Sequence, residues 1–264
     1  MKVLLLGGTG LLGSHLAKRL PESFPTCVAV RPEIDAIDEG SVRGVIDEVK
    51  PAVIVNAIGL KVGVQAALNG VNAVFPRRLA SIAERAGARV VHVSTDAVFS
   101  GAQGNHRESD EPDPVDEYGR TKLAGELGSP HLTIRTSFFG RSPRGDGLVE
   151  WAIAQRGRSI EGFLDYRFTG LSAALLADLV VAAIGARAPL EGVYHVGGEP
   201  VSKHELLAAI GQELHLDLRV VPVGSGKVDR TLNADRFFAA LGRQRPTLAE
   251  SVATLGSCGV LSRS

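Results

Sequence analysis

The chain has 264 residues, of which 44% are hydrophobic, and its 29 Lys and Arg residues balance 29 Asp and Glu residues. A chain of this length and composition can bury one substantial core, alone or with a small additional lobe. Its zero net charge gives no reason to expect a nucleic-acid or membrane partner that binds through bulk charge.

The sequence shows no pattern typical of secretion, membrane insertion or metal binding. No apolar run approaches the roughly 20 residues of a membrane span. The first expected strand begins at Val3, which leaves no room for a signal peptide. Cys27 and Cys258 fit no disulfide or metal spacing, and the seven histidines have no ligand spacing. We therefore expect a cytoplasmic protein without a catalytic metal.

The first half of the chain alternates short apolar runs with helical patterns. Val3–Leu6 is continuously apolar, as expected of a parallel strand that is buried on both faces. This alternation predicts an α/β protein with a Rossmann-type, doubly wound parallel sheet, which binds ligands at the carboxyl ends of its strands. The predicted strands are 3–6, 27–30, 53–55, 89–94 and 132–136, and the predicted helices are 11–20, 41–49, 71–86 and 118–127.

The rhythm changes at about Gly140. Ser202 and Glu205 have the spacing of a capping box at the start of a helix. We predict that residues 141–264 form a smaller, substrate-binding lobe, partly interleaved with the sheet. Its predicted helices are 148–155, 173–184 and 202–214, and its predicted strands are 193–196 and 219–223.

A glycine-rich turn, residues 7–13 (GGTGLLG), joins the first strand to its helix. Gly7, Gly10 and Gly13 are spaced so that the chain can turn tightly and bring backbone amides close to a pyrophosphate. Its position between a strand and an amphipathic helix favours a dinucleotide site over an ordinary glycine turn. Residues 1–140 are therefore predicted to form an NAD(P)-binding Rossmann domain, with Thr9 and the three glycines at the cofactor.

The end of the second strand indicates which nicotinamide cofactor is used. An acid there would accept hydrogen bonds from the adenosine ribose and favour NAD, but this chain has Arg31. A guanidinium suits the charge and geometry of a 2′-phosphate, so we predict NADPH, with NADH as the alternative. A solvated surface arginine is the other interpretation of Arg31. Asp35 is expected near the adenine pocket.

Tyr118 and Lys122 are four residues apart, so on a helix they share one face. An unperturbed tyrosine has a pKa of about 10 and is a poor proton donor at neutral pH. We expect the Lys122 ammonium to lower the pKa of Tyr118 and to hold the nicotinamide ribose. Thr95, at the end of the fourth strand, can orient a substrate carbonyl. The same spacing also occurs by chance on surface helices. Thr95 and the glycine turn favour the catalytic interpretation over that one.

The segments around these residues resemble a known family. Residues 94–101 (STDAVFSG), 108–112 (ESDEP) and 118–126 (YGRTKLAGE) are similar in content and order to the central block of one group within the extended short-chain dehydrogenase/reductase superfamily. This is the dTDP-4-dehydrorhamnose reductase-like group of nucleotide-sugar 4-ketoreductases. The resemblance covers most of the chain, and this central block is highly specific. Similar segments of the group match residues 51–57, 135–137 and 230–233.

The resemblance implies hydride transfer from NAD(P)H to the C4 ketone of a nucleotide-linked 4-keto-6-deoxy sugar, for polysaccharide or glycoside biosynthesis. It makes Tyr118 the proton donor, Lys122 its partner and ribose clamp, and Thr95 the ligand of the sugar oxygen. Asp96 lies beside the sugar, and Phe138 stands where a tryptophan often contacts it. Along the cofactor, the resemblance places Gly10, Leu11, Leu12, Asn56, Ala57, Gly59, Leu60, Lys61, Val93, Tyr118 and Lys122.

Departures from the family pattern leave the substrate open. Ala97 stands where the group usually has tyrosine, and residues 59–61 differ from its small, polar stretch. Some members of the wider set reduce UDP-linked sugars. Asn72 either supports the site or lies on a helix surface, and Trp151 is expected in the core rather than stacked on a sugar. Arginines that could grip a diphosphate, each with a structural or surface role as the alternative, are Arg135, Arg141, Arg144, Arg167 and Arg230.

Two other functions fit the same fold. An epimerase or dehydratase would use the same tyrosine but keep its NAD tightly bound. A non-catalytic regulatory subunit would need no proton donor, and the intact set of Thr95, Tyr118 and Lys122 argues against it. The nucleotide, the sugar, the stereochemistry at C4 and the oligomeric state stay open, with a homodimer as one option.

Overall fold

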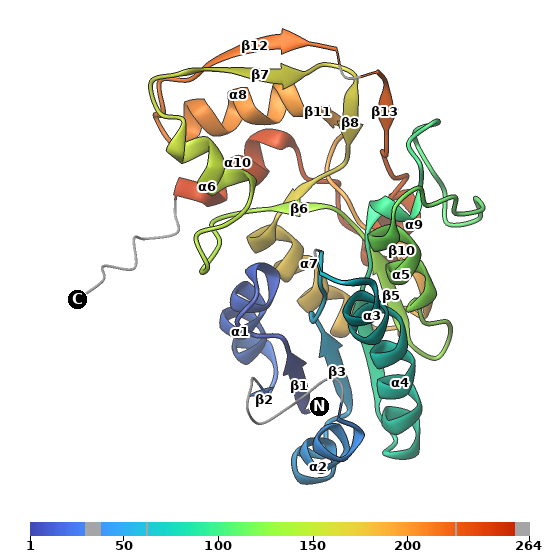
Figure 1. The fold of residues 1–264 in the computed structure, drawn as a ribbon. Coiled ribbons are helices and arrows are strands. Elements are labelled where there is room, and N and C mark those ends of the chain that lie inside the picture. The colour runs from blue at the N-terminus through green and yellow to red at the C-terminus, as the bar shows by residue number, and fades with distance from the viewer. Residues whose placement is uncertain (30–37, 62, 225, 257–264) are drawn as a thin grey trace.

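The computed structural model describes residues 1–29, 38–61, 63–224 and 226–256. Its centre is a sheet of six parallel strands in the order β10-β5-β4-β3-β1-β2 (Figure 1). The predicted doubly wound α/β fold is thereby confirmed. The strands are β1 (Val3–Leu6), β2 (Thr26–Ala29), β3 (Val53–Asn56), β4 (Arg89–Val93), β5 (Leu132–Arg135) and β10 (Gly192–His195).

The strand order reverses between β1 and β3. From β1 the chain passes to β2 on one side, and it then crosses to β3, β4 and β5 on the other. In open parallel sheets such a reversal creates a crevice at the carboxyl ends of the two strands, where ligands bind. The glycine turn follows β1 and Ala57 follows β3, so both predicted cofactor segments lie at this crevice.

Helices cover both faces of the sheet, because successive strand residues point to opposite sides. On one face, Val3 and Leu5 join a core with α1 (Leu11–Ser23) and α7 (Ala173–Ile184). On the other face, Leu4 and Leu6 join a core with α2 (Glu39–Val49) and α4 (Phe75–Arg85). β1 is therefore continuously apolar because its side chains enter two separate cores, one on each face of the sheet.

The second half of the chain contributes to the main sheet and to an outer layer. β10 is the sixth strand of the sheet and α7 covers one of its faces. An outer layer lies beyond the sheet (Figure 1), and its buried side chains form a core of their own. Its helices are α6 (Leu148–Ala154), α8 (Lys203–Glu213) and α10 (Leu248–Gly256). Its strands are β7 (Ser159–Phe163), β8 (Tyr166–Phe168), β11 (Val201–Ser202), β12 (Arg219–Val223) and β13 (Val228–Asp229).

Several elements differ from the sequence expectation. The helix expected at 71–86 begins earlier and contains a π-helical turn, so it comprises α3 (Gln65–Asn69), η1 (Gly70–Val74) and α4. Trp151 is 44% exposed on α6, so its expected place in the core is wrong. No helix of the described ranges is long and apolar enough to cross a membrane. Short elements without a clear period were not expected: β6 (Phe138–Phe139), β9 (Leu171–Ser172) and α9 (Asp235–Leu241).

Candidate functional site

The glycine turn after β1 forms a cradle that larger residues could not form. Gly7 has a φ of +87°, and a Cβ there would lie 2.9 Å from the carbonyl carbon of Ala57. A Cβ on Gly13 would lie 1.9 Å from the carbonyl oxygen of Gly7. Only glycine permits both the left-handed turn and this close approach. The cradle therefore brings the start of α1 against the segment that follows β3.

The start of α1 leaves its first amides free of side-chain caps. Gly10 is the N-cap residue, and the first turn of the helix has no acidic residue. The first amides of a helix lack partners within the helix, and a phosphate group can accept their hydrogen bonds. Thr9 is exposed beside this turn, Leu11 is half-buried and Leu12 is buried. The residues present therefore fit a dinucleotide pyrophosphate.

Asn72 fixes the loop that follows β3. Its Oδ1 accepts a hydrogen bond from Leu60 N at 2.9 Å, and its Nδ2 donates to Leu60 O at 2.8 Å. Nδ2 also lies 3.2 Å from Thr121 Oγ1 on α5 (Glu117–Ala124). Asn72 is fully buried in the π-helical turn, so the helix-surface alternative is wrong. It ties the 59–61 loop to the helix that carries Tyr118.

Lys122, on α5, lies beside the loop that follows β3. Its Nζ donates a hydrogen bond to Val93 O at 2.6 Å. A Cβ on Gly59 would lie 3.8 Å from this nitrogen, so Gly59, Val93 and Lys122 are brought together as expected. Lys122 is only 3% exposed. Burial lowers its pKa to about 8, against the opposing charge of Glu126.

Thr95 and Tyr118 are neighbours, because the Thr95 hydroxyl acts on the pKa of the Tyr118 phenol. Burial raises the pKa of Tyr118 to about 12, although the Thr95 hydroxyl acts in the opposite direction. The expectation that Lys122 lowers this pKa is therefore wrong. Burial disfavours the phenolate, and the Lys122 nitrogen bonds to Val93 O instead. Tyr118 thus holds its proton at neutral pH, as a proton donor must.

Asp96 adds a half-buried carboxyl group beside Thr95. Burial raises its pKa to about 6, while the charges of Arg230 and Lys61 and the hydroxyl of Thr95 act to lower it. Lys61, expected along the cofactor, is therefore close enough to Asp96 for its charge to act there. Phe138, on β6, packs against the core of the α1 and α7 face. Its expected contact with the sugar stays a prediction.

His92 belongs to this cluster and was not expected from the sequence. It is fully buried on β4, with Nδ1 3.1 Å from Asn56 Nδ2 and Nε2 3.5 Å from Lys122 Nζ. Burial, with Lys122 nearby, holds the pKa of His92 well below its usual value. Ligand spacing gives no hint of such a residue. The available signal was a polar side chain inside the apolar strand at 90–93.

The arginine candidates separate into different roles. Arg135 is buried and forms a two-point ion pair with Glu126, at 2.9 and 2.8 Å, so it is structural. Arg230 Nε is buried and has no hydrogen-bond partner among the described residues. Its charge acts on Asp96, which places it near the candidate substrate site. The other candidates, half-buried or exposed, are Arg141, Arg144 and Arg167.

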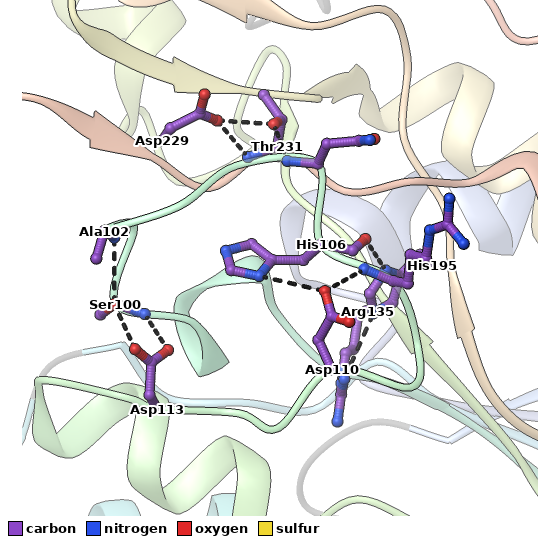
Figure 2. A network of polar contacts seen from close by, with 11 residues as sticks. Ser100, Ala102, His106, Asp110, Asp113, Arg135, His195, Asp229 and Thr231 are labelled. Carbon is purple, nitrogen blue, oxygen red and sulfur yellow. Dashed lines mark hydrogen bonds and ion pairs between the residues drawn. The ribbon is translucent and has the colours of Figure 1, made fainter.

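A polar network holds the loop between β4 and α5 (Figure 2). Within it, Asp113 accepts a hydrogen bond from Ser100 N at 2.8 Å. His195 Nδ1 lies 3.0 Å from the carbonyl oxygen of His106, which ties the loop to β10. Because this loop leads directly into α5, the network fixes the segment that brings Tyr118 to Thr95.

Two expected cofactor contacts, Arg31 and Asp35, lie outside the described residues. In the described ranges, no three His, Cys, Asp or Glu side chains gather as metal ligands.

A groove of about 820 Å³ lies between the end of α1, α7 and α9. Its lining includes Arg19 and Asp178, which pair with each other at 3.0 Å. This groove is at the opposite end of α1 from the glycine cradle, so we place the candidate site at the carboxyl ends of the strands.

Comparison with known proteins agrees with this geometry. The dTDP-4-dehydrorhamnose reductase of Aggregatibacter actinomycetemcomitans is 31% identical over 233 residues, which cover 80% of this chain and 79% of that protein. The probable low-salt glycan biosynthesis reductase Agl14 of Haloferax volcanii is 28% identical over 97% of both chains.

The fold also matches solved structures. The crystal structure of Bacillus anthracis dTDP-4-dehydrorhamnose reductase in complex with NADP has a TM-score of 0.86 and 24% identity, over 96% of this chain and 98% of that one. The sequence profile of the RmlD substrate binding domain matches residues 1–237. The chain therefore belongs to the RmlD family of dTDP-4-dehydrorhamnose reductase-like proteins.

Proposed function

We propose that this chain is an NADPH-preferring reductase of the C4 ketone of a nucleotide-linked 4-keto-6-deoxy sugar. The observation that carries the proposal is that three features lie together at the carboxyl ends of the sheet strands. These are the glycine cradle, the neighbouring side chains of Thr95 and Tyr118, and the buried Lys122. The reductases that are similar in sequence support the same reaction. The product would serve polysaccharide or glycoside biosynthesis.

The residues divide the work of binding and proton transfer. The nicotinamide, when bound, supplies the hydride that C4 of the sugar receives. The cradle at Gly7–Gly13 and the free amides of α1 hold the pyrophosphate. Lys122 holds the nicotinamide ribose, and Thr95 orients the ketone oxygen. Tyr118, neutral at working pH, gives its phenolic proton to that oxygen, which completes the alcohol.

The charge distribution supports a phosphate-bearing sugar as substrate. Arg230 has an unpartnered, buried Nε near Asp96, and Lys203 Nζ lies 3.8 Å from the centroid of the Tyr166 ring. The charge of Arg230 also acts on Lys203 and Tyr166, so the four groups are neighbours. We assign Arg230 to the substrate diphosphate, with Asp96 and Phe138 at the sugar.

The test is an assay of NADPH oxidation with dTDP- and UDP-linked 4-keto-6-deoxy sugars, in parallel with NADH. We expect turnover with at least one sugar, and faster turnover with NADPH because of Arg31. Absence of oxidation across the panel would contradict the proposal. Release of tightly bound NAD⁺ on denaturation would support the epimerase or dehydratase alternative instead.

A further inference from the structure

A line of three buried polar side chains leads from the end of β3 to Lys122. Asn56 and His92 are fully buried, and the parallel register places them side by side on β3 and β4. Asn56 Nδ2 lies 3.1 Å from His92 Nδ1, and His92 Nε2 lies 3.5 Å from Lys122 Nζ. The sheet therefore fixes the first contact, and α5 brings Lys122 to the second.

The orientation of the Asn56 amide follows from its other contact. Asn56 Oδ1 accepts a hydrogen bond from the backbone N–H of Ile58 at 3.1 Å. A backbone N–H can only donate, so the amide oxygen must face Ile58. A flipped amide would bring two donors together and lose this bond. Asn56 therefore presents an N–H group to His92.

This N–H group selects one form of the His92 ring. Nδ1 must offer a lone pair to accept from Asn56, and a neutral imidazole then carries its hydrogen on Nε2. Burial keeps His92 neutral, because it holds the pKa well below the usual value. The Nε2–H group faces Lys122 Nζ. An ammonium group can only donate, whereas a neutral amine offers a lone pair, so this contact favours the amine.

We propose that Asn56 and His92 are positioning residues that set the charge state of Lys122 and, through it, the upper pH limit of the reaction. The role of Lys122 rests on the proposed function. In the proposed function Lys122 holds the nicotinamide ribose, and a neutral amine binds the ribose hydroxyls less strongly than an ammonium does, so activity falls as Lys122 deprotonates.

Glu126, Tyr118 and His92 are titratable groups that lie around Lys122. Glu126, just beyond α5, favours the ammonium, but its carboxylate is already engaged by Arg135 from β5. Tyr118 lies one turn earlier on the same helix and is neutral at working pH. His92 is the titratable group that faces Lys122 from β4. Burial lowers the pKa of Lys122. The N–H group of His92 acts on this pKa in the same direction.

The variant Asn56→Asp reverses the hydrogen-bond direction. One carboxylate oxygen keeps the bond from Ile58 N, and the other accepts from His92 Nδ1–H. The hydrogen of His92 moves to Nδ1, and Nε2 becomes an acceptor for the Lys122 ammonium. Nitrogen-15 NMR of the histidine ring identifies the tautomer, and NMR of the lysine side chain gives the pKa of Lys122. We expect Nε2–H in the wild type, Nδ1–H in the variant, and a Lys122 pKa raised by about one unit or more.

Two further variants separate the tautomer from the added charge. Asn72→Asp places a carboxylate on the other side of Gly59, where a Cβ would lie 3.6 Å from Asn72 Oδ1 and 3.8 Å from Lys122 Nζ. It should raise the pKa of Lys122 less than Asn56→Asp does, and leave His92 with Nε2–H. His92→Phe removes the N–H group without adding charge, and should also raise the pKa of Lys122.

The alkaline limb of the pH profile of kcat/KM should move with the pKa of Lys122 in each variant. Nδ1–H in the wild type, an unchanged tautomer in Asn56→Asp, or an unchanged Lys122 pKa in His92→Phe would each overturn the proposal. The wild-type tautomer and His92→Phe decide the matter even if Asn56→Asp fails to fold. The NMR measurements need no turnover, so a failure of the proposed function is distinguished from a failure of this inference.

Discussion

The first backbone amides of a helix have different partners at the carboxyl ends of the sheet strands and in the outer layer. In the outer layer, α8 satisfies its own first amides, because Ser202 Oγ accepts from Glu205 N at 3.1 Å and the Glu205 carboxylate accepts from Ser202 N at 2.6 Å. At the sheet, α1 begins at Gly10 without any side-chain cap. In both helices, the first backbone amides have no partner within the helix itself. The difference separates a helix start that stabilises the fold from one that can bind an anion.

The carboxyl groups of Asp96 at the sheet and Glu205 in the outer layer show the same contrast. At the carboxyl ends of the strands, burial raises the pKa of Asp96 to about 6 and of Tyr118 to about 12, and lowers that of Lys122 to about 8. In the outer layer, hydrogen bonds from Ser202 lower the pKa of Glu205, which makes the capping carboxylate more stable in its charged form. Burial of a group in its charged form costs stability. Groups whose pKa is strongly shifted by burial cluster at functional sites.

The largest expected effect at the sheet is that of Tyr118→Phe. The variant removes the proton donor but keeps the ring, so turnover should fall by about 10²- to 10⁴-fold. The cofactor affinity should change little, since the cradle lies after β1. Steady-state kinetics and a fluorescence titration with NADPH measure the two quantities. Unchanged turnover would refute the role given to Tyr118.

A substitution in the cradle should separate binding from stability. Gly13→Ala adds a Cβ 1.9 Å from the Gly7 oxygen, which should weaken NADPH binding and lower the free energy of unfolding by about 1–3 kcal/mol. Gly44→Ala on α2 is the matched control, because nothing lies within 4 Å of its added Cβ. That variant should be stabilised by about 0.4–1 kcal/mol and bind NADPH normally. Equal NADPH affinity and equal stability of the two variants would contradict the role given to the cradle.

The stability of Asp96→Asn should depend on pH with a definite sign. The pKa of Asp96 in the folded chain, about 6, lies above its usual value of 3.8, so the ionised carboxylate opposes folding. This cost appears as pH rises from the usual pKa and is complete above the folded pKa. Thermal melts should therefore show the variant to be more stable than the wild type above pH 6, by at most about 3 kcal/mol. The two should melt alike near pH 3, and a lower Tm of the variant at neutral pH would contradict the burial argument.

The smallest expected effect lies in the outer layer. Ser202→Ala removes one half of the capping box of α8 and should lower the free energy of unfolding by about 1 kcal/mol. Chemical denaturation measures this loss. The affinity for NADPH should stay that of the wild type, and a marked loss of affinity would show that the two regions are not as separate as their capping indicates.

Local patterns predicted much of the fold and part of the site. The glycine turn, the strand at Val3–Leu6 and the helix at Ala173–Ile184 are encoded within a few neighbouring residues, and the structure has them where expected. The contact between Asn56 and His92 depends on the register of two strands that are far apart in sequence. No local pattern contains that register, so His92 was missed.

Burial has the same non-local origin. The spacing of Tyr118 and Lys122 correctly places them on one helix, but the pKa of Tyr118 depends on what packs around it. Arg135 could likewise not be assigned from sequence, since its partner Glu126 follows α5 and meets it only in the folded chain.

Transfer of deuterium tests the central claim most directly. The protein would be incubated with a dTDP-linked 4-keto-6-deoxy sugar and NADPH that carries deuterium at the transferred position of the nicotinamide, with UDP-linked sugars and Tyr118→Phe in parallel. We predict a product that carries deuterium at C4 of the sugar with the wild-type chain, and almost none with Tyr118→Phe. Recovery of the unreduced ketone from every sugar, or a product without deuterium at C4, would contradict the account.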